Sequence, residues 1–335
     1  MRTFGRLLGR PAAESSISDQ EWEALIDGSS SVLSVCHPDW RGVRVSARSH
    51  HAPVLEAAHA GTVAGPLVDR MTESGVGVLV VHGFPPGSER LVREAAGRGI
   101  ATRCVLYSSM AQHTAEPGEA AVVDRVVELL DEGSLGRLGF AKEGQAEAFA
   151  ALGVPAHFVP NRPPSVPPLE RLPLGEGLQV GVFGELFWRK NVATQLGGVA
   201  LMGGRAHVIW RPALSYLKGL DVLEHGLLPH QEFLRLQGSV DLNLYVTLSE
   251  CLPLTPVESY ASGVPCLFSR TSMLFRDDPE LWRLTTVDEL DNPAAIARAA
   301  RHLLHKRLEA VKRARRWLDE WDEVAARYWR RFVED

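Results

Sequence analysis

The stretch that decides the fold of this chain is LSECLPLTPVESYASGVP, residues 248 to 265. Two carboxylates, Glu250 and Glu258, stand eight positions apart in it, with a proline-bearing turn between them. Thr255 is typical of an N-cap, Pro256 of the first helical position and Glu258 of the third residue after the cap. The stretch therefore predicts a turn followed by a short helix that begins with a capping box.

The residues in front of this helix predict a strand. SVDLNLYVT, residues 239 to 247, is rich in apolar and β-branched side chains, so the whole unit reads as strand, turn and helix. The backbone N–H groups of Leu254 and Thr255 would project from the positive end of the helix, where an anion is stabilised. Two interpretations stay open at this point. Either Glu258 only caps the helix and Glu250 is a surface residue, or both carboxylates bind a ligand.

Length and composition set the broad class. A chain of 335 residues favours two domains, and 45% hydrophobic with 23% charged residues is ordinary for a soluble protein. A net charge of -5 does not favour nucleic-acid binding. The four scattered cysteines form no CxxC pair, which indicates a reducing cytoplasm rather than disulfides or a zinc site.

The sequence also bears on membranes. No apolar run reaches the length of a transmembrane helix. The first ten residues, MRTFGRLLGR, carry three arginines but lack the apolar core of a signal peptide, so we expect a frayed terminus. A basic amphipathic segment of this kind leaves open a peripheral contact with the inner face of a membrane. The expected location is cytoplasmic.

Residues 1 to 160 show the strand–helix alternation of a doubly wound α/β domain. The expected strands are 31–36, 76–82, 102–107 and 135–140, and the expected helices are 46–60, 87–98, 119–132 and 142–152. Residues 161 to 177 follow as a proline-rich segment, which indicates a stiff connector between domains.

The alternation restarts in residues 178 to 305, which predict a second doubly wound domain. Its expected strands are 178–183, 205–210, 221–223 and 266–269, and its expected helices are 192–202, 230–237 and one capped by Asn292. A long helix is expected from about 306 to 333 in the tail 306–335. Its aromatic stripe should pack onto the body of the protein and return to the first domain; the stripe is Trp317, Trp321, Val324, Tyr328 and Phe332.

Three segments resemble the GT-B glycosyltransferases, and more specifically the retaining, family-four-like group with an E-x7-E motif. VPN (159–161) resembles the start of that group's linker, and GVFGELFWRKN (181–191) resembles its lysine-bearing glycine loop. Residues 227 to 269 resemble its most specific signature, which contains both glutamates in order and at the expected spacing. The resemblance implies an α/β fold of two Rossmann-like domains, with nucleotide-sugar binding in the second and acceptor binding in the first.

The resemblance also implies roles for individual residues. Glu258 would accept hydrogen bonds from the ribose hydroxyls, and Glu250 would lie at the donor sugar. The backbone around Leu254 and Thr255 would hold the diphosphate, and Lys190 would neutralise it. Fixed donors and a cation at that point stabilise the charge that develops on a departing diphosphate. No cofactor and no metal are expected, since the charge would be met by protein groups.

One position departs from the family pattern. The group usually has an arginine directly after the loop glycine, but here Gly184 is followed by Glu185. A carboxylate about 4 Å from a phosphate would cost about 1 to 4 kcal/mol, depending on the local dielectric. Glu185 must therefore turn away or pair with a cation, and Arg189 is a hypothetical source of the missing positive charge.

The candidates in the first domain are fewer. Gly42 resembles the glycine whose backbone lies near the donor phosphates in this group. His82 ends a predicted strand, where α/β sheets place ligands, and His113 follows another. Each histidine is either catalytic or a structural hydrogen-bonding residue, and the sequence leaves both readings open.

The predicted function is retaining transfer of a hexose from a nucleotide-diphosphate sugar to a glycan, lipid or small-molecule acceptor in carbohydrate biosynthesis. The mechanism implied is dissociative, with the acceptor attacking on the face that the diphosphate leaves. Two alternatives stay open: a catalytically inactive GT-B-like binding or regulatory subunit, and another GT-B enzyme such as a nucleotide-sugar epimerase or a phosphorylase.

Overall fold

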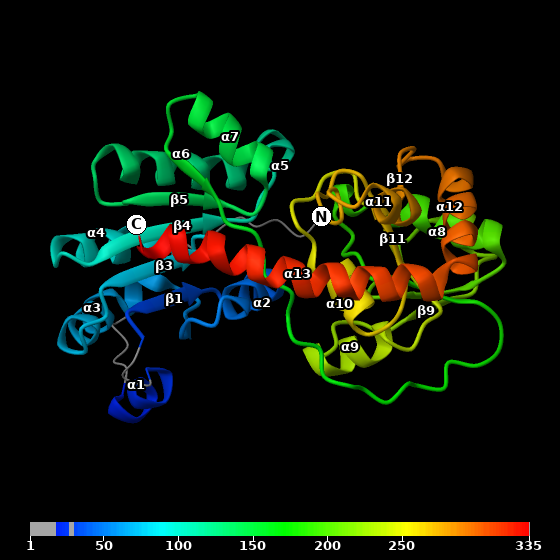
Figure 1. Cartoon of the computed structure of the whole chain (residues 1–335), viewed down its shortest axis with the longest axis horizontal. Helices are drawn as coiled ribbons and strands as arrows, with labels where there is room; N and C mark the ends of the chain where they lie inside the picture. The colour runs from blue at the N-terminus through cyan, green and yellow to red at the C-terminus, as the bar shows by residue number, and fades with distance from the viewer. Residues whose placement is uncertain (1–17, 27–29, 335) are drawn as a thin grey trace. The chain divides into compact units, whose positions relative to one another are not determined.

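A computed structural model describes residues 18–26 and 30–334 of the chain (Figure 1). The chain divides into two units. The first comprises the described residues up to Pro160 together with those from Arg327 onward, and the second spans Asn161–Ala326. Each unit is built around one parallel sheet with helices on both faces. The two Rossmann-like α/β units expected from the alternation are therefore confirmed.

The first unit holds a sheet of strand order β2-β1-β3-β4-β5-β6, in which every described pairing is parallel. Its strands are β1 (Val32–Cys36), β2 (Val54–Glu56), β3 (Val78–His82), β4 (Ala101–Leu106), β5 (Arg137–Phe140) and β6 (Ala156–Phe158). Its helices are α1 (Asp19–Leu25), α2 (Arg41–Ser49), the 3-10 turn η1 (Ala60–Thr62), α3 (Ala64–Glu73), α4 (Ser88–Gly97), α5 (Met110–Ala115), α6 (Pro117–Asp131) and α7 (Glu143–Ala151).

Alternate side chains of β3 enter two different cores. Leu79 and Val81 pack with residues of α3, α4 and α6, whereas Val80 packs with Trp329 and Phe332. Successive side chains of a strand point to opposite faces of the sheet, so a strand buried on both faces reads as a continuous apolar run. This is why VGVLVVH predicted a central strand.

The second unit holds a sheet of strand order β12-β11-β10-β7-β8-β9, again parallel throughout its described pairings. Its strands are β7 (Gln179–Val182), β8 (Arg205–Val208), β9 (Val222–Glu224), β10 (Leu242–Tyr245), β11 (Cys266–Ser269) and β12 (Thr286–Val287). Its helices are η2 (Trp188–Lys190), α8 (Val192–Met202), η3 (Ser215–Leu217), α9 (His230–Gln237), α10 (Leu254–Ala261), α11 (Pro279–Thr285), α12 (Pro293–His305) and the greater part of α13 (Arg307–Glu334).

The two faces of this second sheet are covered by different helices. α8 and α12 pack on one core with Val180, Val182 and Leu244. α10 and α13 pack on another with Tyr245 and Phe268. Helices on both faces leave only the loop-bearing ends of the strands open to a ligand.

Two expectations about the first unit were wrong. The helix expected over 46–60 ends at Ser49, because His51 adopts a left-handed backbone (φ 59°) and Pro53 follows; the chain then forms β2. Helix α3 was not expected, since Gly65 and Pro66 suggest a turn. Both lie in the first turn of the helix, where N–H groups have no intrahelical acceptor and proline is tolerated.

The proline-rich residues 161–177 contain no helix or strand. They lie along the second unit, where the backbone N–H of Leu172 donates to Ser239 Oγ (2.8 Å), and the side chains of Val166, Leu169 and Leu172 pack near α9. Apolar residues set between the prolines therefore attach this segment to the core of the second unit.

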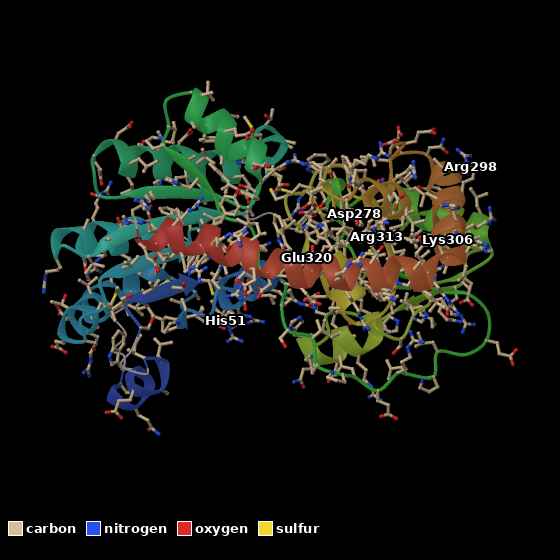
Figure 2. All side chains as sticks on the ribbon, in the orientation of Figure 1. His51, Asp278, Arg298, Lys306, Arg313 and Glu320 are labelled. Carbon is tan, nitrogen blue, oxygen red and sulfur yellow. The ribbon has the colours of Figure 1, made fainter. Side chains whose placement is uncertain are left out.

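Helix α13 buries two members of the predicted stripe, Trp317 and Phe332, and half-buries Trp321, Val324 and Tyr328; Trp329, which was not predicted, is also buried. Trp317 lies against Phe275 in the second unit (ring centroids 5.0 Å apart), and Arg313 forms a bidentate pair with Asp278, the N-cap of α11 (Figure 2). The residues from Arg327 onward belong to the first unit, where Trp329 and Phe332 are buried. One continuous helix thus contributes to both cores.

Within the described residues, no helix is long and apolar enough to cross a membrane. The cysteines Cys36, Cys104, Cys251 and Cys266 are buried and free. The N-terminal segment that was considered for membrane contact, residues 1 to 10, lies outside the described residues.

Candidate active site

The order of the second sheet identifies where a ligand should bind. The chain runs outward from β7 through β8 to β9, then returns to the other side of β7 with β10. In open parallel sheets, ligands bind beyond the carboxyl ends of the two strands between which this reversal occurs. Here those strands are β7 and β10, and the loops that follow them are residues 183–191 and 246–253.

These two loops are tied together by a buried amide. Gln195, in the first turn of α8 and 1% exposed, donates from Nε2 to the carbonyl of Lys190 (2.7 Å) and accepts at Oε1 from the N–H of Val246 (2.9 Å). The backbone N–H of Leu248 also donates to the carbonyl of Arg189 (2.7 Å). The side chains that follow β7 and β10 are therefore held in a fixed register with each other.

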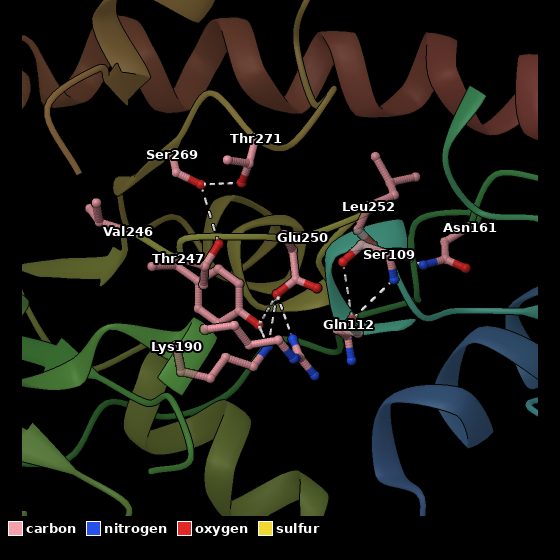
Figure 3. A network of polar contacts seen from close by, with 12 residues as sticks. Ser109, Gln112, Asn161, Lys190, Val246, Thr247, Glu250, Leu252, Ser269 and Thr271 are labelled. Carbon is pink, nitrogen blue, oxygen red and sulfur yellow. Dashed lines mark hydrogen bonds and ion pairs between the residues drawn. The ribbon is translucent and has the colours of Figure 1, made fainter. Parts of the chain in front are cut away.

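Four polar side chains meet between the loops (Figure 3). Lys190 Nζ lies 2.7 Å from Glu250 Oε2, and Arg189 Nη1 lies 3.4 Å from the same oxygen. Tyr245 donates its hydroxyl to Glu250 Oε2 (3.0 Å) and accepts a hydrogen bond from Lys190 Nζ. The structure thus brings together three residues predicted from the sequence and adds Tyr245. We refer to Arg189, Lys190, Tyr245 and Glu250 as the charged cluster.

Burial and charge act against each other in the charged cluster. Burial tends to raise the pKa of the Glu250 carboxyl, but the charges of Lys190 and Arg189 and the hydrogen bonds from Lys190 and Tyr245 hold this pKa below its usual range. Burial lowers the pKa of the Lys190 ammonium, an effect that the Glu250 charge opposes. Burial and the Glu250 charge both raise the pKa of the Tyr245 phenol. The cluster therefore combines two cations and one carboxylate with a phenol that keeps its proton.

Helix α10 begins two residues earlier than predicted. α10 starts at Leu254 with Pro253 as its N-cap and no side-chain cap hydrogen bond, so the predicted Thr255 cap and the capping box were wrong. Pro256 is the third helical residue, a position where the missing N–H still breaks no intrahelical bond. The N–H groups of Leu254 and Thr255 lie in the uncapped first turn, the positive end of the helix dipole.

Glu258 consequently lies too far along the helix to cap it and has another partner. Its side chain is 4% exposed, and its Oε1 lies 2.8 Å from Nε2 of His230, the first residue of α9. A buried carboxylate requires such a partner. Glu258 therefore points toward α9 rather than back to the start of α10.

The glycine loop has the close packing that its glycine suggests. A Cβ on Gly184 would approach Lys190 Cβ to 3.1 Å and Val192 Cγ2 to 3.2 Å. Glycine thus lets the loop fold tightly over the lysine. Glu185 is exposed, and its charge still acts on Lys190, where it favours the charged ammonium. Arg189 is the cation that lies beside Lys190 in the charged cluster.

The candidates of the first unit differ in burial. His82 is fully buried, with Nδ1 2.7 Å from Tyr107 Oη and Nε2 3.2 Å from Ser34 Oγ, and burial lowers its pKa to about 3. It lies inside the unit rather than facing a cleft, because β3 is buried on both faces. His113 is half-buried, with Nε2 3.3 Å from Ser108 Oγ, and burial lowers its pKa.

Gly42 lies in the first turn of α2, exposed, and a Cβ there would meet nothing within 4 Å. The described structure therefore gives no steric reason for glycine at this position.

Sequence reasoning missed three residues of the site: Tyr245, Gln195 and His230. Tyr245 looked like one more apolar strand residue, and Gln195 like part of a helix face. His230 had a local signal, its place at the start of a predicted helix within residues 227–269, the segment that resembles the family signature. Only the packing of α9 on α10 gives it a partner. Among the described residues, no group of three or more His, Cys, Asp or Glu side chains is arranged to hold a metal ion.

The comparisons with known proteins bear on the fold. No protein-family model matches the sequence, and no curated protein matches it. Solved structures do match. An α,α-trehalose-phosphate synthase (UDP-forming) from Burkholderia xenovorans, in complex with glucose-6-phosphate, aligns over 88% of this chain and 85% of its own, with a TM-score of 0.56 and 13% identity.

Two further structures align similarly. A structure described as trehalose-6-phosphate from E. coli bound with UDP-2-fluoro glucose covers 93% of this chain and 84% of its own, with a TM-score of 0.56 and 12% identity. An α,α-trehalose 6-phosphate synthase from Burkholderia multivorans covers 86% and 78%, with a TM-score of 0.55 and 12% identity. The fold of this chain therefore matches that of trehalose-phosphate synthases, a GT-B glycosyltransferase architecture of two Rossmann-like units.

Proposed function

We propose that this chain is a retaining glycosyltransferase that moves a hexose from a nucleotide-diphosphate sugar to an acceptor. One observation carries the proposal: the charged cluster lies beyond β7 and β10, where a doubly wound sheet binds its ligand. The GT-B fold supports the same conclusion, and so does the uncapped N-terminal turn of α10, which follows the loop that carries Glu250.

The residues supply the charges that this chemistry needs. A departing nucleoside diphosphate gains negative charge, which Lys190, Arg189 and the first-turn N–H groups of α10 can stabilise. We propose that Lys190 exchanges its partner Glu250 for a diphosphate oxygen when the donor binds. Glu250 would then face the donor sugar. Because protein cations meet the charge, the proposed reaction requires neither a metal nor another cofactor.

The proposed step conserves the configuration of the sugar. The bond between the anomeric carbon and the diphosphate oxygen breaks, and the acceptor oxygen forms its bond on the same face. The acceptor proton passes to the departing phosphate oxygen, so no nucleophile from the protein is needed. Glycans, lipids and small molecules all remain candidate acceptors; the similar structures from B. xenovorans and E. coli hold glucose-6-phosphate and UDP-2-fluoro glucose, which makes these the first compounds to test.

Binding of nucleotides is the first experiment. The melting temperature should rise with one of UDP, GDP, ADP and dTDP, and the matching nucleotide sugar should be hydrolysed or transferred. Lys190→Ala should weaken binding of the diphosphate far more than binding of the nucleoside, whereas Glu258→Ala should weaken both. No shift with any of the four nucleotides would refute the proposal.

A binding or regulatory subunit without turnover is the second candidate, and Glu185 favours it. This exposed carboxylate stands where the resembling group has an arginine, so a cation that helps the leaving group is missing from that position. Nucleotide binding without hydrolysis or transfer, across sugar-phosphate, glycan and lipid acceptors, would support this candidate over the enzyme.

A further inference from the structure

Helix α9 contacts α10 through a polar side chain at each of its ends. At its first residue, His230 Nε2 lies 2.8 Å from Glu258 Oε1. At its last residue, Gln237 donates from Nε2 to the carbonyl of Thr255 (2.9 Å), and Gln237 is fully buried. Asn243 of β10 donates to the carbonyl of Gln237 (3.1 Å) and to Ser259 Oγ (2.8 Å), so α9, α10 and the sheet form one hydrogen-bonded assembly.

The two members of the His230–Glu258 pair differ in exposure. The Glu258 side chain is 4% exposed, whereas that of His230 is 32% exposed. A purely structural pair deep in a core would bury both partners, but here the histidine reaches the surface beside the carboxylate. The pair therefore lies at the border between the core of the second unit and solvent, where a ligand hydroxyl can approach.

Hydrogen-bonding capacity limits what Glu258 can do. A carboxylate has two oxygens with about four acceptor positions. The contact from His230 uses one position on Oε1 and leaves capacity for the two hydroxyls of a ribose. A donor on one oxygen also restricts rotation of the carboxylate, which lowers the cost of ordering it when a ligand binds.

We propose that His230 is a positioning residue that orients Glu258 for recognition of the ribose hydroxyls, so that the nucleotide of the donor is a ribonucleotide rather than a deoxyribonucleotide. This inference rests on the proposed function, in which Glu258 contacts the ribose. His230 acts through Glu258 and does not touch the reacting atoms. It sets which nucleotide binds rather than how fast the sugar is transferred.

The test compares the dissociation constants of UDP, 2′-deoxy-UDP and 3′-deoxy-UDP by calorimetry, with the matching GDP or ADP series if UDP does not bind. The wild-type protein should prefer the ribonucleotide by about tenfold or more, because a hydrogen bond to a charged group contributes about 1.5–3 kcal/mol. In His230→Ala the ratio of the deoxyribonucleotide and ribonucleotide dissociation constants should fall to about 1. In His230→Gln, whose amide also donates, it should be largely kept.

Controls separate positioning from loss of structure. A variant that merely loosens α9 weakens the binding of all three nucleotides equally and leaves the ratio of their dissociation constants unchanged. His305→Ala, an exposed histidine at the end of α12, should leave every constant unchanged. In the double variant His230→Ala/Glu258→Gln, the preference should be no lower than in Glu258→Gln alone, since both changes remove the same interaction.

The outcomes are distinct. If the wild-type protein binds none of the nucleoside diphosphates, the proposed function fails and the inference fails with it. If it binds them and His230→Ala keeps the full preference for the ribonucleotide, only the inference fails.

Discussion

His82 and Tyr245 occupy equivalent places in two sheets of the same kind, yet their surroundings differ. Each is the last residue of a central parallel strand, β3 in the first unit and β10 in the second. Both nitrogens of His82 are bonded to side chains inside its own unit. The Tyr245 hydroxyl instead reaches the loop residues Lys190 and Glu250. A polar residue at a strand end is thus a site residue only where the adjoining loops bring further charges to it.

The charge of the partners explains the difference. The hydroxyls of Tyr107 and Ser34 are neutral, and burial lowers the pKa of His82 to about 3, so the ring stays uncharged at neutral pH. The second unit places two cations and a carboxylate around one tyrosine. Buried ion pairs add little stability compared with apolar packing, so their presence at a switch point favours a role in ligand binding.

The largest effect is expected from breaking the charged cluster. Glu250→Gln should destabilise the protein by about 3 to 5 kcal/mol, since it leaves Lys190 and Arg189 without their carboxylate. Lys190→Met should destabilise it less, because Arg189 still faces Glu250. The double variant should lose less stability than the sum of the two single variants, because the charges of Lys190 and Glu250 are removed together and Arg189 alone remains charged. Denaturant unfolding of the four proteins measures this coupling. Strict additivity would mean that the two side chains are independent in solution.

Removal of His82 should affect stability without affecting nucleotide binding. His82→Ala should lower the free energy of unfolding by about 2 to 4 kcal/mol, because it leaves a cavity and removes the hydrogen bonds between His82 and the hydroxyls of Tyr107 and Ser34. Nucleotide affinity, measured well below the melting temperature, should match that of the wild-type protein. A folded variant that binds nucleotide normally but no longer transfers sugar would restore the catalytic reading of this histidine.

The same histidine should make the protein less stable in mild acid. Its folded-state pKa, about 3, lies below the ordinary 6.5, so between these values the unfolded chain binds a proton that the native state does not. Its contribution is full above pH 6.5 and declines as pH falls toward 3. At pH 5 the loss is about 2 kcal/mol relative to neutral pH. Unfolding at pH 7 and pH 5 should show this loss in the wild-type protein and not in His82→Asn.

The smallest effect is expected at Glu185, which stands where the resembling group has an arginine. Glu185→Arg restores a cation in the glycine loop and should tighten nucleoside diphosphate binding by about two- to tenfold, since exposed charges are screened by solvent. The gain should shrink between 50 and 300 mM salt. Glu176→Arg, an exposed change of the same charge at the end of the proline-rich segment, serves as the matched control. An equal gain in nucleoside diphosphate affinity in both variants would indicate a general effect of the added positive charge.

The sequence by itself determined the alternation of strands and helices, and with it the fold class. The run 76–82 is almost entirely apolar because its strand is buried on both faces, and that signal is local in the chain. The sequence also indicated Lys190, Arg189 and Glu250 as candidates, through the resemblance of their segments. It misjudged the ends of α2 and α10, where a left-handed His51 and an uncapped turn decide the boundary.

Only the tertiary structure decided what the polar residues contact. Glu258 fits a capping box by spacing, but its partner is His230, twenty-eight residues earlier in the chain, because α9 packs on α10. Tyr245 joins the charged cluster because parallel pairing places the ends of β7 and β10 side by side. Contacts between residues far apart in sequence arise from sheet order and helix packing, and a local pattern in a single chain does not encode them.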